Sequence, residues 1–146
     1  MVKTVKFLRV LSVILFLGVL ALVYAYLPVE VQLSEEKGQL FMHKETFFYY
    51  AIGVFLIINL FSALFIYLLT PLVMLRGGEE AVAWLTGFGF VLNIYLVLLT
   101  GFVGVLNNQA HVSVGGFAYL NYLGPILILG WIIGIFYLLK SSKQTP

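Results

Sequence analysis

Two asparagines lie where an amide without a partner would be costly. Asn59 and Asn93 each sit near the middle of a long apolar run, and moving an amide from water into an apolar medium without a hydrogen bond costs about 2–7 kcal/mol. A short connection joins the two runs, so they are expected to be antiparallel neighbours. We predict that the amides bond to each other or to a nearby backbone or hydroxyl group, Ser62 being one turn from Asn59. Structural pairing is favoured over the alternative, a polar lining for a substrate or ion.

The two histidines, His43 and His111, lie in polar segments between apolar runs. Together they could bind a metal ion or the edge of a haem, but they lack the carboxylate-rich third position that a metal site of this kind needs. Solvated loop residues are therefore expected. With the nearby carboxylates Glu30, Glu35 and Glu36, the histidines are candidates for an external interaction surface.

Small residues recur at helical spacing in two apolar runs. Gly130 and Gly134 form a GxxxG motif, and Gly101 and Gly104 thin one face of the preceding run. Small side chains let helix backbones approach closely in a membrane. We predict that these glycines act in helix–helix packing, either within the chain or against a partner.

The composition defines the solvent in which these residues act. The chain has 146 residues, of which 62% are hydrophobic and 10% charged, against about 25% charged in a soluble domain. Cysteine is absent, which excludes disulfides, thiolate zinc sites and iron–sulfur clusters. Neither a basic stripe for nucleic acid nor an acid–base pair or nucleophile for catalysis is present. We expect no enzyme activity, no cofactor and no nucleic-acid partner.

Four apolar runs are long enough to cross a bilayer, which takes about 20 residues. Helices are expected, because the alternating polarity of a membrane barrel is missing. The sequence predicts one all-α transmembrane domain over residues 1–146, with external loops at 28–46 and 106–121. The four predicted spans are Phe7–Leu27, Phe47–Leu69, Ala81–Val105 and Tyr122–Leu139.

Proline and glycine mark the ends of these spans. Pro28 closes the first, and Pro71 is expected to interrupt the second near its end, leaving Leu72–Leu75 as a kinked extra turn. Gly77-Gly78 predicts a tight connection to the third span.

The first external loop has the pattern of a small hairpin. Residues 29–34 alternate apolar and polar side chains, as in a half-buried strand. Glu35–Gly38 is a turn candidate, and Gln39–His43 is expected to return as a second strand. The loop should therefore form a small cap on the external face.

The basic residues predict the orientation. Six of them flank one side, and only Lys37 and Lys44 flank the other. Both termini are therefore expected in the cytoplasm, in a bacterial inner membrane. The start also resembles a signal peptide ending at Val23-Tyr24-Ala25, but the apolar run is long for one, so we expect the first helix to be retained. The six residues are Lys3, Lys6 and Arg9 near the N-terminus, Arg76 between the second and third spans, and Lys140 and Lys143 after the fourth.

One segment resembles a known family. Leu27-Pro28-Val29-Glu30-Val31, then Gly38, then Lys44 and Phe47 resemble a small bacterial membrane domain of unknown function. That domain occurs in the immunity and signalling protein that protects spore-forming bacteria from the sporulation-delaying toxin. In the family, a helix ends in Leu-Pro, an extended segment and a glycine follow, and a lysine precedes the next helix. The resemblance covers about residues 20–65 and implies an immunity or signalling role, with no functional residue carried over.

These patterns leave three functions open. With no ionisable side chain expected in the membrane interior, pumps and coupled transporters are disfavoured. The leading hypothesis is a non-catalytic accessory subunit of a respiratory, photosynthetic, secretion or motor complex, whose partners are the bilayer and other membrane subunits. The alternative is an immunity or signalling protein that senses a peptide or toxin through its external loops. The third is a passive channel or carrier that uses Asn59 and Asn93.

Overall fold

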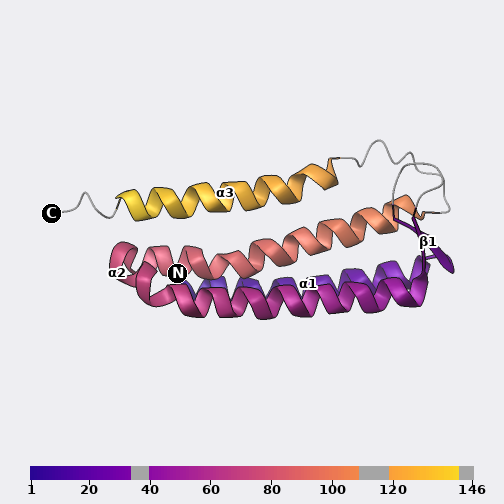
Figure 1. Cartoon of the computed structure of the whole chain (residues 1–146), viewed down its shortest axis with the longest axis horizontal. Helices are drawn as coiled ribbons and strands as arrows, with labels where there is room; N and C mark the ends of the chain where they lie inside the picture. The colour runs from indigo at the N-terminus through magenta and orange to yellow at the C-terminus, as the bar shows by residue number, and fades with distance from the viewer. Residues whose placement is uncertain (34–39, 109–118, 142–146) are drawn as a thin grey trace.

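The computed structural model describes residues 1–33, 40–108 and 119–141. In chain order the elements are α1 (Val2–Tyr26), β1 (Glu30–Gln32), β2 (Phe41–His43), α2 (Lys44–Leu106) and α3 (Leu120–Ser141). Both α1 and α3 pack against α2, which forms the middle of the bundle (Figure 1). The described part of the chain is therefore all-α apart from one small hairpin, as predicted.

The 63 residues of α2 reverse direction at Gly78. Gly78 has φ 64° and ψ −161°, a backbone conformation essentially confined to glycine. Residues 44–77 form a first arm and residues 79–106 a second arm, and the two run in opposite directions (Figure 1). The predicted connection at Gly77-Gly78 is confirmed, and the second and third predicted spans are the two arms of this one element.

The predicted interruption at Pro71 is wrong. The first arm continues as a helix through Pro71 to the bend. Proline costs a helix about 3 kcal/mol, but the turn that follows is held by packing. Val73 is buried in a cluster with Ala81 and Leu85 of the second arm, so one residue of this turn packs into the bundle core, while Leu72, Met74 and Leu75 are exposed.

The predicted hairpin is confirmed in its two strands. β1 and β2 are antiparallel, with Glu30 opposite His43, Val31 opposite Met42 and Gln32 opposite Phe41. Val31 is fully buried while Glu30 is exposed, which is the alternation expected from the sequence. The predicted turn at Glu35–Gly38 lies outside the described residues.

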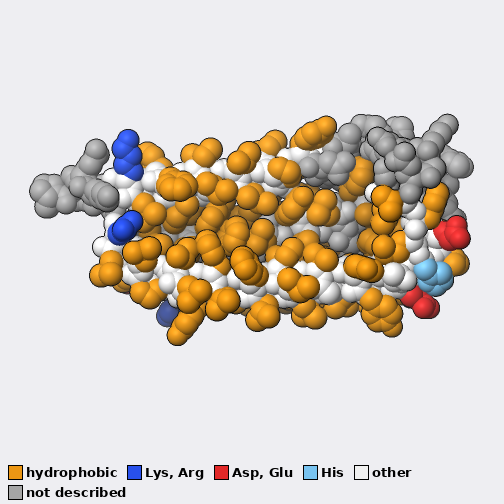
Figure 2. Space-filling model, viewed as in Figure 1, with side chains coloured by type: hydrophobic (Ala, Val, Ile, Leu, Met, Phe, Trp, Pro, Cys, Tyr) orange, Lys and Arg blue, Asp and Glu red, His pale blue; other side chains and the backbone are white. Residues whose placement is uncertain are grey.

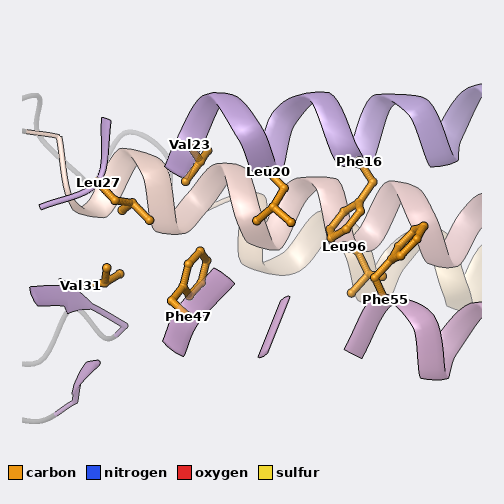
Figure 3. Packing of buried hydrophobic residues seen from close by; sticks show 8 residues of the cluster. All are labelled: Phe16, Leu20, Val23, Leu27, Val31, Phe47, Phe55 and Leu96. Carbon is orange, nitrogen blue, oxygen red and sulfur yellow. The ribbon is translucent and has the colours of Figure 1, made fainter. Parts of the chain in front are cut away.

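A core next to the hairpin joins α1, the hairpin and both arms of α2 (Figure 3). The rings of Phe16 and Phe55 stack with centroids 4.4 Å apart and planes 6° from parallel. Leu20 and Val31 are almost fully buried in the same cluster. The whole set is Phe16, Leu20, Val23, Leu27, Val31, Phe47, Phe55 and Leu96.

Two tryptophans join α3 to the second arm. Trp84 Nε1 donates to the backbone oxygen of Trp131, and Trp131 Nε1 donates to the backbone oxygen of Trp84, both at 2.8 Å. Gly134 makes this contact possible, because a Cβ at that position would collide with the Trp84 ring. A Cβ at Gly130 would meet nothing within 4 Å.

The two glycines of the GxxxG motif should therefore respond differently to substitution by alanine. Gly134→Ala should lower the free energy of unfolding by about 1–2 kcal/mol, because the Trp84 ring must move. Gly130→Ala is the matched control and should leave it unchanged or slightly higher, since alanine is the better helix former. Thermal unfolding in detergent, followed by tryptophan fluorescence, measures both. Equal effects would contradict the assigned packing.

Three of the described helices, α1, α2 and α3, are long and apolar enough to cross a membrane. Apolar side chains cover the long face of the bundle, cationic side chains gather at one end, and carboxylates and a histidine lie at the other (Figure 2). Large side chains such as Leu60, Phe61 and Ile133 are more than half exposed on the outside. This is the surface of an integral membrane protein, whose outward side chains contact lipid.

Candidate functional site

The two asparagines meet between the arms of α2. Asn59 Nδ2 donates to Asn93 Oδ1 at 2.8 Å and to the backbone oxygen of Phe55 at 3.0 Å. Asn93 has no exposed surface. The predicted pairing of the amides is therefore present in the structure. Their role, structural or as a polar lining, stays a prediction.

Residues of α1 extend this pair into a polar ring. Asn93 Nδ2 donates to Ser12 Oγ at 3.1 Å, and Ser12 Oγ donates to the backbone oxygen of Arg9 at 2.7 Å. The Arg9 guanidinium donates to Ser62 Oγ at 3.2 Å, and Ser62 Oγ donates to the backbone oxygen of Asn59 at 3.0 Å. The hydrogen bonds thus run from Arg9 through three helical segments and back to Arg9.

The position of Arg9 corrects the sequence analysis. Arg9 was counted in the basic flank of the first span, but it lies inside α1, which begins at Val2. The guanidinium points at the first arm, and Gly89 of the second arm makes room for it, because a Cβ there would lie 2.6 Å from Arg9 Nε. Arg9 is therefore part of a helix that is long and apolar enough to cross a membrane.

The packed face of α1 explains this position, and the sequence alone does not mark that face because apolar residues surround the helix. The buried residues of α1 are Ser12, Phe16, Leu20 and Val23, spaced by three or four positions as on one helix face. Arg9 lies three residues before Ser12 and continues that face toward the N-terminus. Charge counting assigned Arg9 to the basic flank, whereas helical periodicity places it on the packed side.

A groove of about 670 Å³ opens beside Arg9, between α1 and the first arm. Two cations, Lys6 and Arg9, line it together with the amide of Asn59. No carboxylate is among the described residues that line this groove. Its other lining residues are Val2, Val10, Val13, Ala63, Ile66, Tyr67, Thr70, Val82 and Thr86.

Of the five residues predicted to form an external interaction surface, the structure describes two. Glu30 and His43 face each other across the hairpin strands and are exposed. His111, Glu35 and Glu36 lie outside the described residues. Among the residues that are described, no group of three metal-ligating side chains is found.

One functional contact at this end was missed by sequence reasoning. Asn107 Oδ1 accepts the backbone N–H of Gln32, and Asn107 Nδ2 donates to the backbone oxygen of Gln32, both at 2.8 Å. The side-chain amide thus pairs with β1 as a neighbouring strand would and attaches the hairpin to the end of α2. An amide at a helix end carries no sequence signal for this role.

Of the two selected glycines of the second arm, one is in close contact with a neighbouring helix and the other is not, as in the GxxxG pair. A Cβ at Gly104 would lie 2.9 Å from Val23 Cγ2, so this glycine allows α1 to approach closely. A Cβ at Gly101 would meet nothing within 4 Å. A Cβ at Gly124, which the sequence analysis did not select, would collide with the Tyr95 ring. In each pair, one glycine is thus needed for close packing inside the chain, and a Cβ at the other would meet open space.

No family model, curated protein or solved structure matches this chain. Its function must therefore be argued from the polar ring and from the groove beside it.

Proposed function

We propose that the chain is a non-catalytic accessory subunit of a larger membrane protein complex. In this proposal it crosses the bacterial inner membrane four times, through α1, the two arms of α2, and α3. The end that carries the cationic side chains in Figure 2 would be cytoplasmic, because basic residues are retained on that side. Both termini would then lie in the cytoplasm.

The closed polar ring is the observation that carries this proposal. Ser12, Ser62 and Asn93 are each at most 1% exposed. Asn93 bonds to Ser12, and Ser62 bonds to Arg9 and to the backbone oxygen of Asn59. Among the described residues, no buried side-chain nitrogen or oxygen lacks a partner. A pore or carrier needs polar groups that face a water path or a ligand. Here the buried polar groups hold the helices together, which favours a scaffold over a passive channel.

Arg9 changes one step of the sequence argument. An ionisable side chain within a span marks a functional site by default, so a lack of such groups does not exclude transport by this chain. What disfavours a passive pore is the ring, in which the buried polar groups form hydrogen bonds with other groups of the chain. Arg9 itself reaches the lateral groove, where a second membrane protein could contact it.

Gentle purification tests the proposal. The natively expressed protein, extracted in mild detergent, should migrate in native electrophoresis well above its own 16.4 kDa. Mass spectrometry of that band should then find other membrane proteins at constant stoichiometry. A lone chain or a simple homo-oligomer would contradict the proposal and favour the immunity or signalling alternative. In that case, deleting residues 28–46 should abolish the response while leaving membrane insertion intact.

A further inference from the structure

We infer that the groove beside Arg9 receives a transmembrane helix of a partner protein, and that this helix carries an aspartate or glutamate at the depth of Arg9. The inference rests on the proposed function and deepens it, because it names the contact by which the subunit would recognise its complex. Three observations support it: the charge of the groove, its depth in the bundle and the character of its walls.

The charge of the groove calls for an acidic group. Arg9 and Lys6 both line it, and among the described residues the Arg9 guanidinium makes one hydrogen bond, to Ser62, and no ion pair. A guanidinium has five N–H donors in a planar fork. A carboxylate can accept two of them in parallel, which makes this pairing both strong and specific in direction.

The depth of Arg9 decides between a helix and a lipid headgroup. Ser12 bonds to Asn93, which is the middle residue of the predicted span Ala81–Val105. Arg9 lies three residues from Ser12, or about 5 Å along the axis of α1. In a bilayer centred on Asn93, whose hydrocarbon core extends about 15 Å to each side, a lipid phosphate would remain about 10 Å from the Arg9 backbone along the membrane normal. A carboxylate on a transmembrane helix can lie at any depth.

Local packing keeps the guanidinium at this depth. A long cationic side chain can usually extend toward the interface. Here Arg9 Nε lies over Gly89, and the guanidinium is bonded to Ser62, which holds the charge at the level of its own turn. An intramembrane charge of this kind typically pairs with an opposite charge.

The walls of the groove suit an apolar helix. Val10, Val13, Ala63 and Ile66 give its sides branched or small apolar side chains, among which the neutral polar groups of Asn59, Tyr67, Thr70 and Thr86 are interspersed. The volume of about 670 Å³ accommodates side chains of a helix lying along the groove. The expected partner segment is therefore an apolar helix with a single acidic residue on the contacting face.

The test uses a defined probe in a defined membrane. The purified full-length protein is placed in vesicles of zwitterionic phosphatidylcholine with a labelled leucine–alanine helix that has one aspartate about 5 Å from its centre. Energy transfer measures the association. Matched helices have asparagine or leucine at that position. We expect the aspartate helix to associate about tenfold more tightly than the leucine helix.

Variants of the chain assign the effect to Arg9. Arg9→Leu should remove most of the preference for aspartate, and Arg9→Lys should keep part of it, because the charge remains and the planar fork is lost. Val10→Leu, on the groove wall, is the control and should preserve it. Tryptophan fluorescence verifies that each variant is folded. In Arg9→Leu, Ser62 Oγ keeps its hydrogen bond to the backbone oxygen of Asn59.

Four results would overturn the inference. The wild type could show no preference for the aspartate helix, or Arg9→Leu could show the same preference. Alternatively, anionic phosphatidylglycerol could abolish the preference and be retained in native mass spectrometry only when Arg9 is present, which would assign the groove to a lipid. Native partners that copurify equally with Arg9→Leu would also refute the inference while sparing the proposed function. A chain without any partner refutes the proposed function alone, since the probe assay is independent of it.

Discussion

Replacing Asn93 with leucine is expected to lower the free energy of unfolding by about 1–3 kcal/mol, because two interhelical hydrogen bonds are lost at about 0.6–1.7 kcal/mol each. Asn93 bonds both Asn59 and Ser12 and is fully buried. Leucine has a similar volume, so the effect should reflect the missing bonds and not a cavity. The substitution also breaks the polar ring at the position where α1 meets both arms of α2.

A double-mutant cycle isolates the contribution of the asparagine pair. Unfolding is measured in mixed detergent for Asn59→Leu, Asn93→Leu and the double variant. Each single variant already removes the hydrogen bond between the two amides. The double variant should therefore lose less free energy of unfolding than the sum of the two single losses. If Asn59→Leu and Asn93→Leu both left stability and assembly unchanged, the structural role of the pair would be refuted. A flux that depended on both residues would then support the channel hypothesis.

Gly78→Ala is expected to destabilise the chain by about 1–3 kcal/mol, because the bend would have to hold a side chain in a conformation essentially confined to glycine. A Cβ at Gly78 would meet nothing within 4 Å, so the expected cost is conformational and not steric. The bend places the two arms of α2 side by side and thereby brings Asn59 to Asn93. Strain at this one residue should therefore weaken the whole hairpin of helices.

The neighbouring glycine supplies the control. Gly77 lies in the helical part of the first arm, and non-helical angles inside α2 occur at Gly78. Gly77→Ala should raise stability by about 0.5–1 kcal/mol, since alanine is favoured over glycine in a helix. The two variants, measured side by side by thermal unfolding, should thus move in opposite directions. A shift of the same sign in both would mean that the bend does not depend on the backbone angles of Gly78.

Much of the architecture could be predicted from the sequence, because each prediction depends on neighbours along the chain. The length of an apolar run determines whether it can cross a bilayer, and a period of two determines which side of a short strand is buried. The hairpin at Glu30–Gln32 and Phe41–His43 and the bend at Gly77-Gly78 follow from such local patterns. Pairing of Asn59 with Asn93 also follows, because the bend makes the two runs antiparallel and both residues lie near the middle of their runs.

Only the tertiary structure decided how the helices are rotated against one another. Apolar side chains surround each helix, so the sequence does not show which face meets protein and which meets lipid. Rotation places Arg9 against Ser62 and Gly89 and not in the basic flank. It likewise turns Gly134 toward Trp84 and leaves Gly130 outside. The groove beside Arg9 exists only because of these contacts, and it is the part of the protein from which a partner can be inferred.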